Sequence, residues 1–129
     1  METILLVDDD SEVRAFAREI LQREGYTVLD TADPREALQI ARGHGGSIHL
    51  LLTDVVMPEM NGRELADQLA ALRPPMKVVF MSGYSVSETL VPVVAPVVAK
   101  PFTAEGLAGK VREVLDYRSP FGRRGEGQA

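Results

Sequence analysis

The sequence contains no cysteine and no tryptophan, and aromatic residues make up only 5% of its 129 residues. The absence of cysteine excludes a disulfide scaffold, a zinc–thiolate site and a thiol nucleophile. So few aromatic side chains argue against a stacking surface for bases or sugars. Basic residues are also in the minority, with 14 Lys and Arg against 19 Asp and Glu. Nucleic acids and anionic membranes are therefore not the expected partners.

Long apolar runs are missing too. No stretch approaches the roughly 18 apolar residues that a membrane-spanning helix needs, and the start METILLVDDD lacks the basic region of a signal peptide. We therefore expect a soluble, cytoplasmic protein. The length suits a single domain. Because Gly, Arg and Ser dominate after residue 116, we expect a domain over 1–116 and a flexible tail over 117–129.

Five short apolar runs punctuate the chain, and segments with helical periodicity lie between most of them. The runs are 4–7, 27–29, 50–53, 78–81 and 97–99. Apolar strands that alternate with helices predict a parallel sheet covered on both faces. Five such strands in this length favour an α/β, three-layer flavodoxin-like (βα)5 fold with sheet order 2-1-3-4-5. Pro92 and Pro96 interrupt the segment after the fourth strand, so the helix there is expected to be short or irregular.

Local signals predict where several helices begin and end. Ser11 is the expected N-cap of the first helix and Gly25 its stop, whereas Asp33 followed by a proline begins the second. The apolar stripe of the first helix includes Phe16, and that of the third includes Leu72. Both residues lie on the predicted apolar side of their helices, and Leu72 is expected to be buried.

Chemically compatible side chains stand where four of the predicted strands end. The first strand ends in three acids, residues 8–10, and the third ends in Asp54. The fourth ends in Ser82 and the fifth in Lys100. In the expected strand order the first and third strands are neighbours, so their carboxylates should converge at the carboxyl edge of the sheet, where ligands bind in such folds. Converging carboxylates without Cys or paired His favour Mg²⁺, and a nearby hydroxyl and ammonium suit phosphoryl transfer.

Four strings of the sequence carry a resemblance to a known family. They are ILLVDDD, LLTDVVMPEMNG, VVFMSGYS and VVAKPFT, and they occur in this order within residues 3 to 116. Together they resemble the response-regulator receiver (CheY-like) domain of two-component signalling. The segment KPFTAEGLAGKVREVL is most similar to receivers of hybrid sensor histidine kinases.

The resemblance implies a role for each residue of the candidate site. Asp54 matches the phosphoacceptor, which takes a phosphoryl group from a phosphohistidine, Ser82 matches the switch hydroxyl, and Lys100, before a cis proline, matches the phosphate-binding lysine. The metal ligands implied for Mg²⁺, or for Mn²⁺ in its place, are Asp8, Asp9, Asp54 and the backbone carbonyl of Val56.

The resemblance also implies partners and an activity. The partner is a histidine kinase or a histidine phosphotransfer protein, with no nucleic acid or membrane, and the chain is expected to be a monomer before phosphorylation. It is not expected to be a metabolic enzyme. It would catalyse its own aspartyl phosphorylation and dephosphorylation, or form the receiver part of a hybrid histidine kinase. Val97 replaces the aromatic residue that many members place three positions before the lysine, so the usual coupling of hydroxyl and aromatic is not expected.

Two other functions are compatible with the sequence. The first is a protein-interaction module that keeps the receiver fold without phosphotransfer. The second is a small Mg²⁺-dependent phosphohydrolase with Asp8 as nucleophile, although 129 residues leave no room for the cap that such enzymes need.

Overall fold

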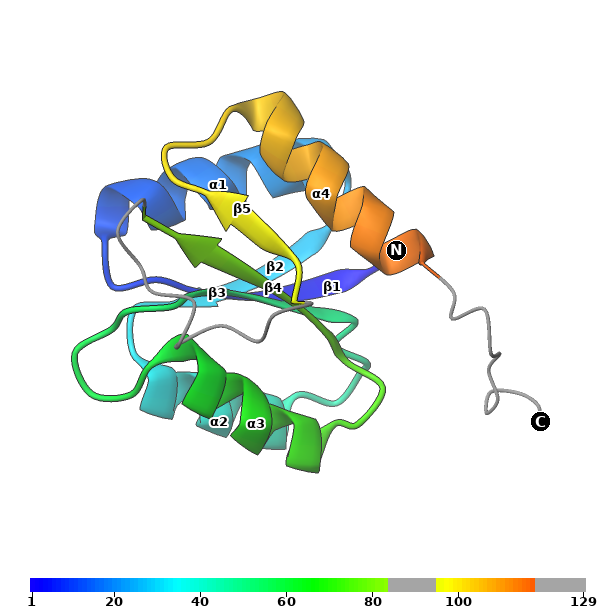
Figure 1. Ribbon diagram of the computed structural model, residues 1–129. Coiled ribbons are helices and arrows are strands. Elements are labelled where there is room, and N and C mark those ends of the chain that lie inside the picture. The colour runs from blue at the N-terminus through cyan, green and yellow to red at the C-terminus, as the bar shows by residue number, and fades with distance from the viewer. Residues whose placement is uncertain (84–94, 118–129) are drawn as a thin grey trace.

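A five-stranded parallel sheet forms the centre of the molecule (Figure 1). The computed structural model describes residues 1–83 and 95–117. The strand order is β2-β1-β3-β4-β5, as predicted. The strands are β1 (Thr3–Val7), β2 (Thr27–Thr31), β3 (Leu50–Asp54), β4 (Lys77–Ser82) and β5 (Val97–Ala99).

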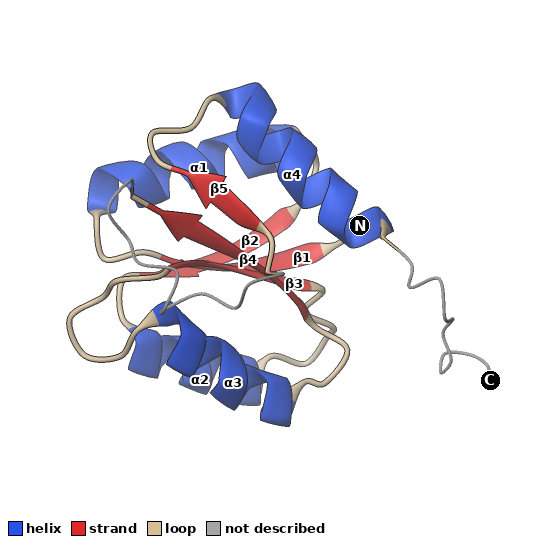
Figure 2. Ribbon diagram, in the orientation of Figure 1, coloured by secondary structure: helices blue, strands red, loops and turns tan. Residues whose placement is uncertain are grey.

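Helices cover both faces of the sheet, which makes the predicted three-layer α/β fold (Figure 2). One face is covered by α1 (Ser11–Arg23) and α4 (Ala104–Asp116), and the other by α2 (Pro34–Gly43) and α3 (Gly62–Leu72). The short or irregular helix expected after β4 falls on 84–94, and the flexible tail falls almost wholly on 118–129. Both lie outside the described residues. Among the helices described, none has the length and apolar character needed to cross a membrane.

The core consists of two apolar layers, one on each side of the sheet. Leu5 and Val7 of β1 pack with α2 and α3, whereas Ile4 and Leu6 pack with α1 and α4. All four side chains are fully buried. Burial on both faces explains why the strands are apolar throughout rather than alternating.

Polar side chains at the helix starts set the helix boundaries. Asp10, not Ser11, caps α1, because its carboxylate accepts the N–H groups of Glu12 and Val13 at 2.9 and 3.2 Å. The Ser11 prediction was therefore wrong, and Ser11 is the first helical residue. Gly25 follows the end of α1 with φ of +97°, a conformation that glycine adopts without strain. Asp33 caps α2 as predicted.

Two apolar residues are more exposed than their helical spacing predicted. Phe16 is 45% exposed, and its ring stacks on Phe102, with centroids 5.7 Å apart. Leu72 is the last residue of α3 and is 41% exposed. Periodicity identifies the apolar side of a helix but does not show how far the neighbouring elements cover it. The expected burial of Leu72 was therefore wrong, and Phe16 is only partly covered.

Candidate functional site

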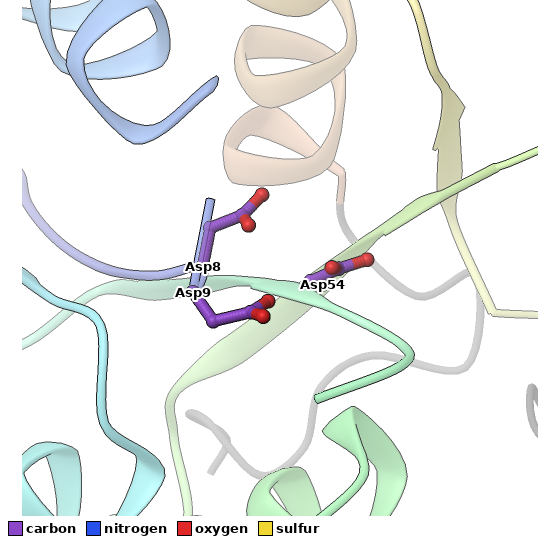
Figure 3. A group of neighbouring side chains, drawn as sticks. All are labelled: Asp8, Asp9 and Asp54. Atoms are coloured by element: carbon purple, nitrogen blue, oxygen red, sulfur yellow. The ribbon is translucent and has the colours of Figure 1, made fainter. Parts of the chain in front are cut away.

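Three carboxylates meet at the carboxyl edge of the sheet (Figure 3). Asp8 and Asp9 directly follow β1, and Asp54 is the last residue of β3, the neighbouring strand. One oxygen from each side chain lies within 4.8 Å of the others. The convergence follows from the strand order, since β1 and β3 are paired in register up to Val7 and Thr53.

The three acids differ in exposure. Asp8 is fully buried and Asp54 is 8% exposed, whereas Asp9 is exposed. Asp8 Oδ1 accepts the backbone N–H of Asp10 at 2.9 Å. Asp8 Oδ2 is the one buried side-chain oxygen or nitrogen, within residues 1–83 and 95–117, that has no hydrogen-bond partner. A buried carboxylate oxygen without a hydrogen bond is costly unless a cation lies beside it.

Lys100 supplies a positive charge at this place. Its Nζ lies 3.0 Å from Asp8 Oδ2 and 3.2 Å from Asp54 Oδ2. The backbone N–H of Lys100 donates to the carbonyl of Ser82 at 2.8 Å, which anchors the end of β5 to β4. The bond between Lys100 and Pro101 is cis, as predicted. The ammonium therefore forms ion pairs with two carboxylates, one directly after β1 and one at the end of β3.

The surroundings shift the pKa values of two of these groups. Burial raises the pKa of the Asp54 carboxyl and the neighbouring charge of Asp8 raises it further, against the lowering effect of Lys100. Burial alone would lower the pKa of Lys100, but its contacts with Asp8 and Asp54 reverse the sign and raise it. The raised pKa keeps the lysine protonated, and three carboxyl groups share the site with this one ammonium.

The carboxylate cluster fits a hard divalent cation. The donors are all carboxylate oxygens, which Mg²⁺ prefers, and the buried Asp8 Oδ2 has only the ammonium of Lys100, at 3.0 Å, as a partner among the described residues. The fourth predicted protein ligand, the carbonyl of Val56, lies two residues beyond Asp54 in the β3–α3 loop. The side chain of Val56 is 54% exposed beside the site.

The end of the β3–α3 loop packs closely against the end of β3. Gly62, the first residue of α3, lies against the backbone of Asp54, and a Cβ added there would collide with the Asp54 carbonyl oxygen. The N–H of Gly62 donates to the carbonyl of Val55 at 2.7 Å. Asn61 and Glu64 complete the turn with a capping box. Only glycine fits at residue 62 without moving the strand that carries Asp54.

Ser82 is the last residue of β4, at the same edge of the sheet. Its hydroxyl donates to the carbonyl of the next residue, Gly83, at 3.0 Å. In this structure the hydroxyl therefore has a local partner and is not bonded to the acids. Val97 begins β5 and is partly exposed, at the position where the resemblance leads one to expect an aromatic side chain.

Two residues near the site were not predicted from the sequence. Arg14 of α1 donates from Nη1 to the carbonyl of Asp8 at 2.8 Å, and its Nε lies 3.2 Å from Asp30 Oδ2. Asp30 belongs to β2, which extends to Thr31 and beyond the apolar run that predicted it. The spacing of six residues between Asp8 and Arg14 could have suggested this contact, because side chains of a first helical turn point back toward the helix start.

The similarity of the chain to known proteins agrees with this geometry. The profile of the response regulator receiver domain matches residues 4–112. The sensor kinase CckA of Brucella abortus is 38% identical over 118 residues, which cover 88% of this chain but only 12% of that kinase. The response regulator receiver protein CpdR of the same organism is 34% identical, with 89% of this chain and 98% of CpdR covered.

Solved structures show the same likeness in three dimensions. The receiver domain of the hybrid histidine kinase CckA is 35% identical and superposes with a TM-score of 0.77. The match covers 88% of this chain and 99% of that domain. A response regulator receiver protein from Sinorhizobium medicae superposes with a TM-score of 0.80 at 25% identity, with 92% of this chain and 97% of that chain covered.

Proposed function

The chain belongs to the response regulator receiver domain family of two-component systems, and from this premise we propose that Asp54 accepts a phosphoryl group in a Mg²⁺-dependent reaction. The proposed donor is a phosphohistidine on a histidine kinase or a histidine phosphotransfer protein. The observation that carries the proposal is the position of Asp54: its carboxylate ends β3, keeps 11% of its side-chain surface exposed and lies 3.2 Å from the ammonium of Lys100.

The proposed step is a displacement at phosphorus. A carboxylate oxygen of Asp54 forms a bond to the phosphorus, and the bond from phosphorus to the imidazole nitrogen of the donor breaks. The bonding pair stays on the imidazole, which then takes up a proton, and Asp54 becomes an acyl phosphate. Burial and the charge of Asp8 raise the pKa of the Asp54 carboxyl, so a cation beside it favours the ionised, nucleophilic form.

The residues proposed to hold Mg²⁺ are Asp8, Asp9, Asp54 and the carbonyl of Val56. A bound Mg²⁺ would neutralise charge on the phosphoryl oxygens. Asp8 is poorly placed to be the nucleophile itself, because it is fully buried and its Oδ1 already accepts the N–H of Asp10. This contrast supports Asp54 rather than Asp8 as the acceptor and weighs against the phosphohydrolase alternative.

Lys100 and Ser82 are proposed to respond to the new phosphoryl group. Lys100 would exchange its contact with the Asp54 carboxylate for one with a phosphoryl oxygen, since the phosphoryl group carries about two negative charges. The Ser82 hydroxyl would leave the carbonyl of Gly83 and donate to the same group. Because Ser82 ends β4 and Lys100 follows β5, both movements would change the surface formed by these two strands.

We further propose that residues 1–116 form the receiver domain and that the chain is a monomer before phosphorylation. Light scattering with and without beryllofluoride tests the second statement. A constant monomer mass without beryllofluoride is expected, and a dimer at low micromolar concentration in its absence would contradict it.

Intact mass spectrometry tests the proposed acceptor. The protein is incubated with Mg²⁺ and acetyl phosphate, and we expect a labile mass increase of one HPO₃ group. Asp54→Asn should abolish the increase. Asp67→Asn, which removes an exposed carboxylate from α3, is the matched control and should leave it unchanged. An increase that persists in Asp54→Asn, or its absence in the unaltered protein despite demonstrated Mg²⁺ binding, would contradict the proposal. The latter would favour the interaction module.

A further inference from the structure

Arg14 joins the acidic site to the edge strand of the sheet. Its guanidinium contacts two acceptors at once: Nη1 donates to the Asp8 carbonyl at 2.8 Å, and Nε pairs with Asp30 at 3.2 Å. Both side chains of this ion pair are largely buried, at 21% and 20% exposure. The planar fork of an arginine can meet two acceptors in fixed directions, which a lysine cannot do.

The contact with Arg14 completes the hydrogen bonding of the Asp8 peptide groups. The N–H of Asp8 donates to the carbonyl of Thr31 at 3.2 Å, which continues the pairing of β1 with β2. Asp8 Oδ1 accepts the N–H of Asp10. Arg14 binds the Asp8 carbonyl, and the remaining carboxylate oxygen, Oδ2, faces the ammonium of Lys100. Asp8 is fully buried, so its carbonyl has no water to replace this donor.

The helix register explains why this arginine reaches back to the site. The N–H of Arg14 donates to the carbonyl of Asp10 at 2.9 Å, so Arg14 lies one turn into α1. Side chains on a helix lean toward its N-terminus, which here points to the end of β1. Asp30 pairs with Leu6 across the β1–β2 ladder, two residues before Asp8, and is thus within reach of the same guanidinium.

From these contacts we propose that Arg14 is a positioning residue for the metal site. It fixes the peptide between Asp8 and Asp9, and thereby the directions in which both carboxylates point. The inference rests on the proposed function as far as Mg²⁺ is concerned. It concerns the geometry of this chain's own residues, however, so part of its test needs no metal.

Charge and geometry predict opposite effects for the loss of Arg14. Removing a positive charge near three carboxylates should strengthen the binding of a cation. Losing the donor that orients Asp8 should weaken it, because outer partners of metal ligands commonly contribute about 10- to 100-fold in affinity. A weakened site therefore indicates positioning and cannot result from the charge change alone.

Arg18 provides a matched control on the same helix. It also forms an ion pair with Asp30, at 3.2 Å, but within residues 1–83 and 95–117 it has no hydrogen bond or ion pair with Asp8. We would compare Arg14→Met with Arg18→Met, since each removes one arginine of α1 and one partner of Asp30. The first readout is the Mg²⁺ dissociation constant from calorimetry. The second, without metal, is the ¹⁵N and ¹H shift of the Asp9 amide, which shares its peptide group with the Asp8 carbonyl.

The expected result is a Mg²⁺ affinity at least roughly tenfold lower in Arg14→Met and unchanged or higher in Arg18→Met. The Asp9 amide should shift in the first variant only. Equal effects in both variants, or an unshifted amide in Arg14→Met, would overturn the inference. If the unaltered protein bound no Mg²⁺, the proposed cofactor would fail, and the amide shift alone would decide the role of Arg14.

A second variant serves if Arg14→Met does not fold. Asp30→Asn keeps Arg14 but removes the charge that holds its Nε. The Asp9 amide should shift in the same direction, and this readout decides, because the lost negative charge would itself weaken Mg²⁺ binding. No change in either readout would contradict a positioning role.

Discussion

The two ends of the sheet use similar charged side chains in different ways. At the amino end, Lys77 begins β4 and donates from Nζ to three carbonyls at the end of α4, those of Val114, Leu115 and Tyr117, at 2.9–3.1 Å. At the carboxyl end, Lys100 faces two carboxylates, with a third nearby. The first lysine completes a helix end, whereas the second only partly compensates a cluster of like charges.

The other cations of the amino end follow the pattern of Lys77. Arg73 donates to the carbonyls of Ala41, His44 and Gly46, which closes the end of α2. Arg112 binds Glu2 and Asp116 and donates to the Tyr26 hydroxyl. Here the charges and hydrogen bonds are matched within the protein. At the carboxyl end, by contrast, three carboxylates face one ammonium. This charge mismatch marks the site at which an added ligand would complete the structure, although both ends use the same kinds of residue.

The largest effect should come from removing the cation of the mismatched end. Lys100→Met keeps the aliphatic stem but leaves the buried Asp8 carboxylate without its ion pair. Breaking a buried pair in this way typically costs about 3 kcal/mol or more of unfolding free energy. Urea unfolding at pH 7 in EDTA measures the loss. The loss should shrink toward acid pH as the carboxylates take up protons.

Lys110→Met is the control for the loss of a lysine in general. Lys110 pairs with Glu113 one turn along α4, and the Glu113 side chain is well exposed. Such surface pairs contribute about 0.5 kcal/mol or less. If both variants lost a similar amount of unfolding free energy, the ion pairs of Lys100 would contribute no more stability than a surface pair. The contrast between the two ends of the sheet would then not hold.

The mismatched end was also the part of the molecule that the sequence revealed most clearly. Asp54 ends β3 and Lys100 directly follows β5, and the parallel order alone brings strand ends together. The contacts of Lys77 with the end of α4 could not be predicted in the same way. They depend on how far a helix extends over a strand and on which way its side chains lean. The exposure of Phe16 was missed for the same reason, since its partner Phe102 lies 86 residues along the chain.

A bound metal should remove the contrast between the two ends. If Mg²⁺ binds the folded but not the unfolded protein, a Mg²⁺ concentration of about 100 times the dissociation constant raises the unfolding free energy by about 2.7 kcal/mol. Thermal unfolding with Mg²⁺ and with EDTA measures this gain. Asp9→Asn, which removes an exposed member of the cluster, should reduce it. Ca²⁺ at the same concentration tests selectivity. An equal gain in Asp9→Asn would show that the metal binds elsewhere.

Lys77→Met tests the matched end with the same substitution. It removes three charged hydrogen bonds from the end of α4 and a favourable charge from its negative pole, which together should cost about 1.5 kcal/mol. Unlike Lys100→Met, it should leave Mg²⁺ affinity and acetyl phosphate labelling unchanged. Urea unfolding and calorimetry on the same preparation separate the two effects. A changed Mg²⁺ affinity would show that the two ends are coupled through β4.

The smallest effect should also have the opposite sign: Asp54→Asn should stabilise the metal-free protein at pH 7. Burial and the charge of Asp8 raise the folded-state pKa of Asp54 above its ordinary value of 3.8. Folding therefore favours the protonated acid. At a pH below 3.8 the carboxyl is protonated in both the folded and the unfolded protein, so it has no destabilising effect on the folded state. As the pH rises through the folded-state pKa the penalty develops fully, and it persists at pH 7.

Asparagine does not titrate, so the stability difference between Asp54→Asn and the unaltered protein should vanish near about pH 3 and grow toward pH 7 in EDTA. Asp67→Asn, which removes an exposed carboxylate from α3, is the matched control at each pH. Saturating Mg²⁺ should reverse the order at pH 7, since the metal stabilises the protein that retains all three carboxylates. If Asp54→Asn is instead the less stable protein in EDTA at pH 7, the ion pair with Lys100 outweighs burial and repulsion, and the carboxyl end is as well matched as the amino end.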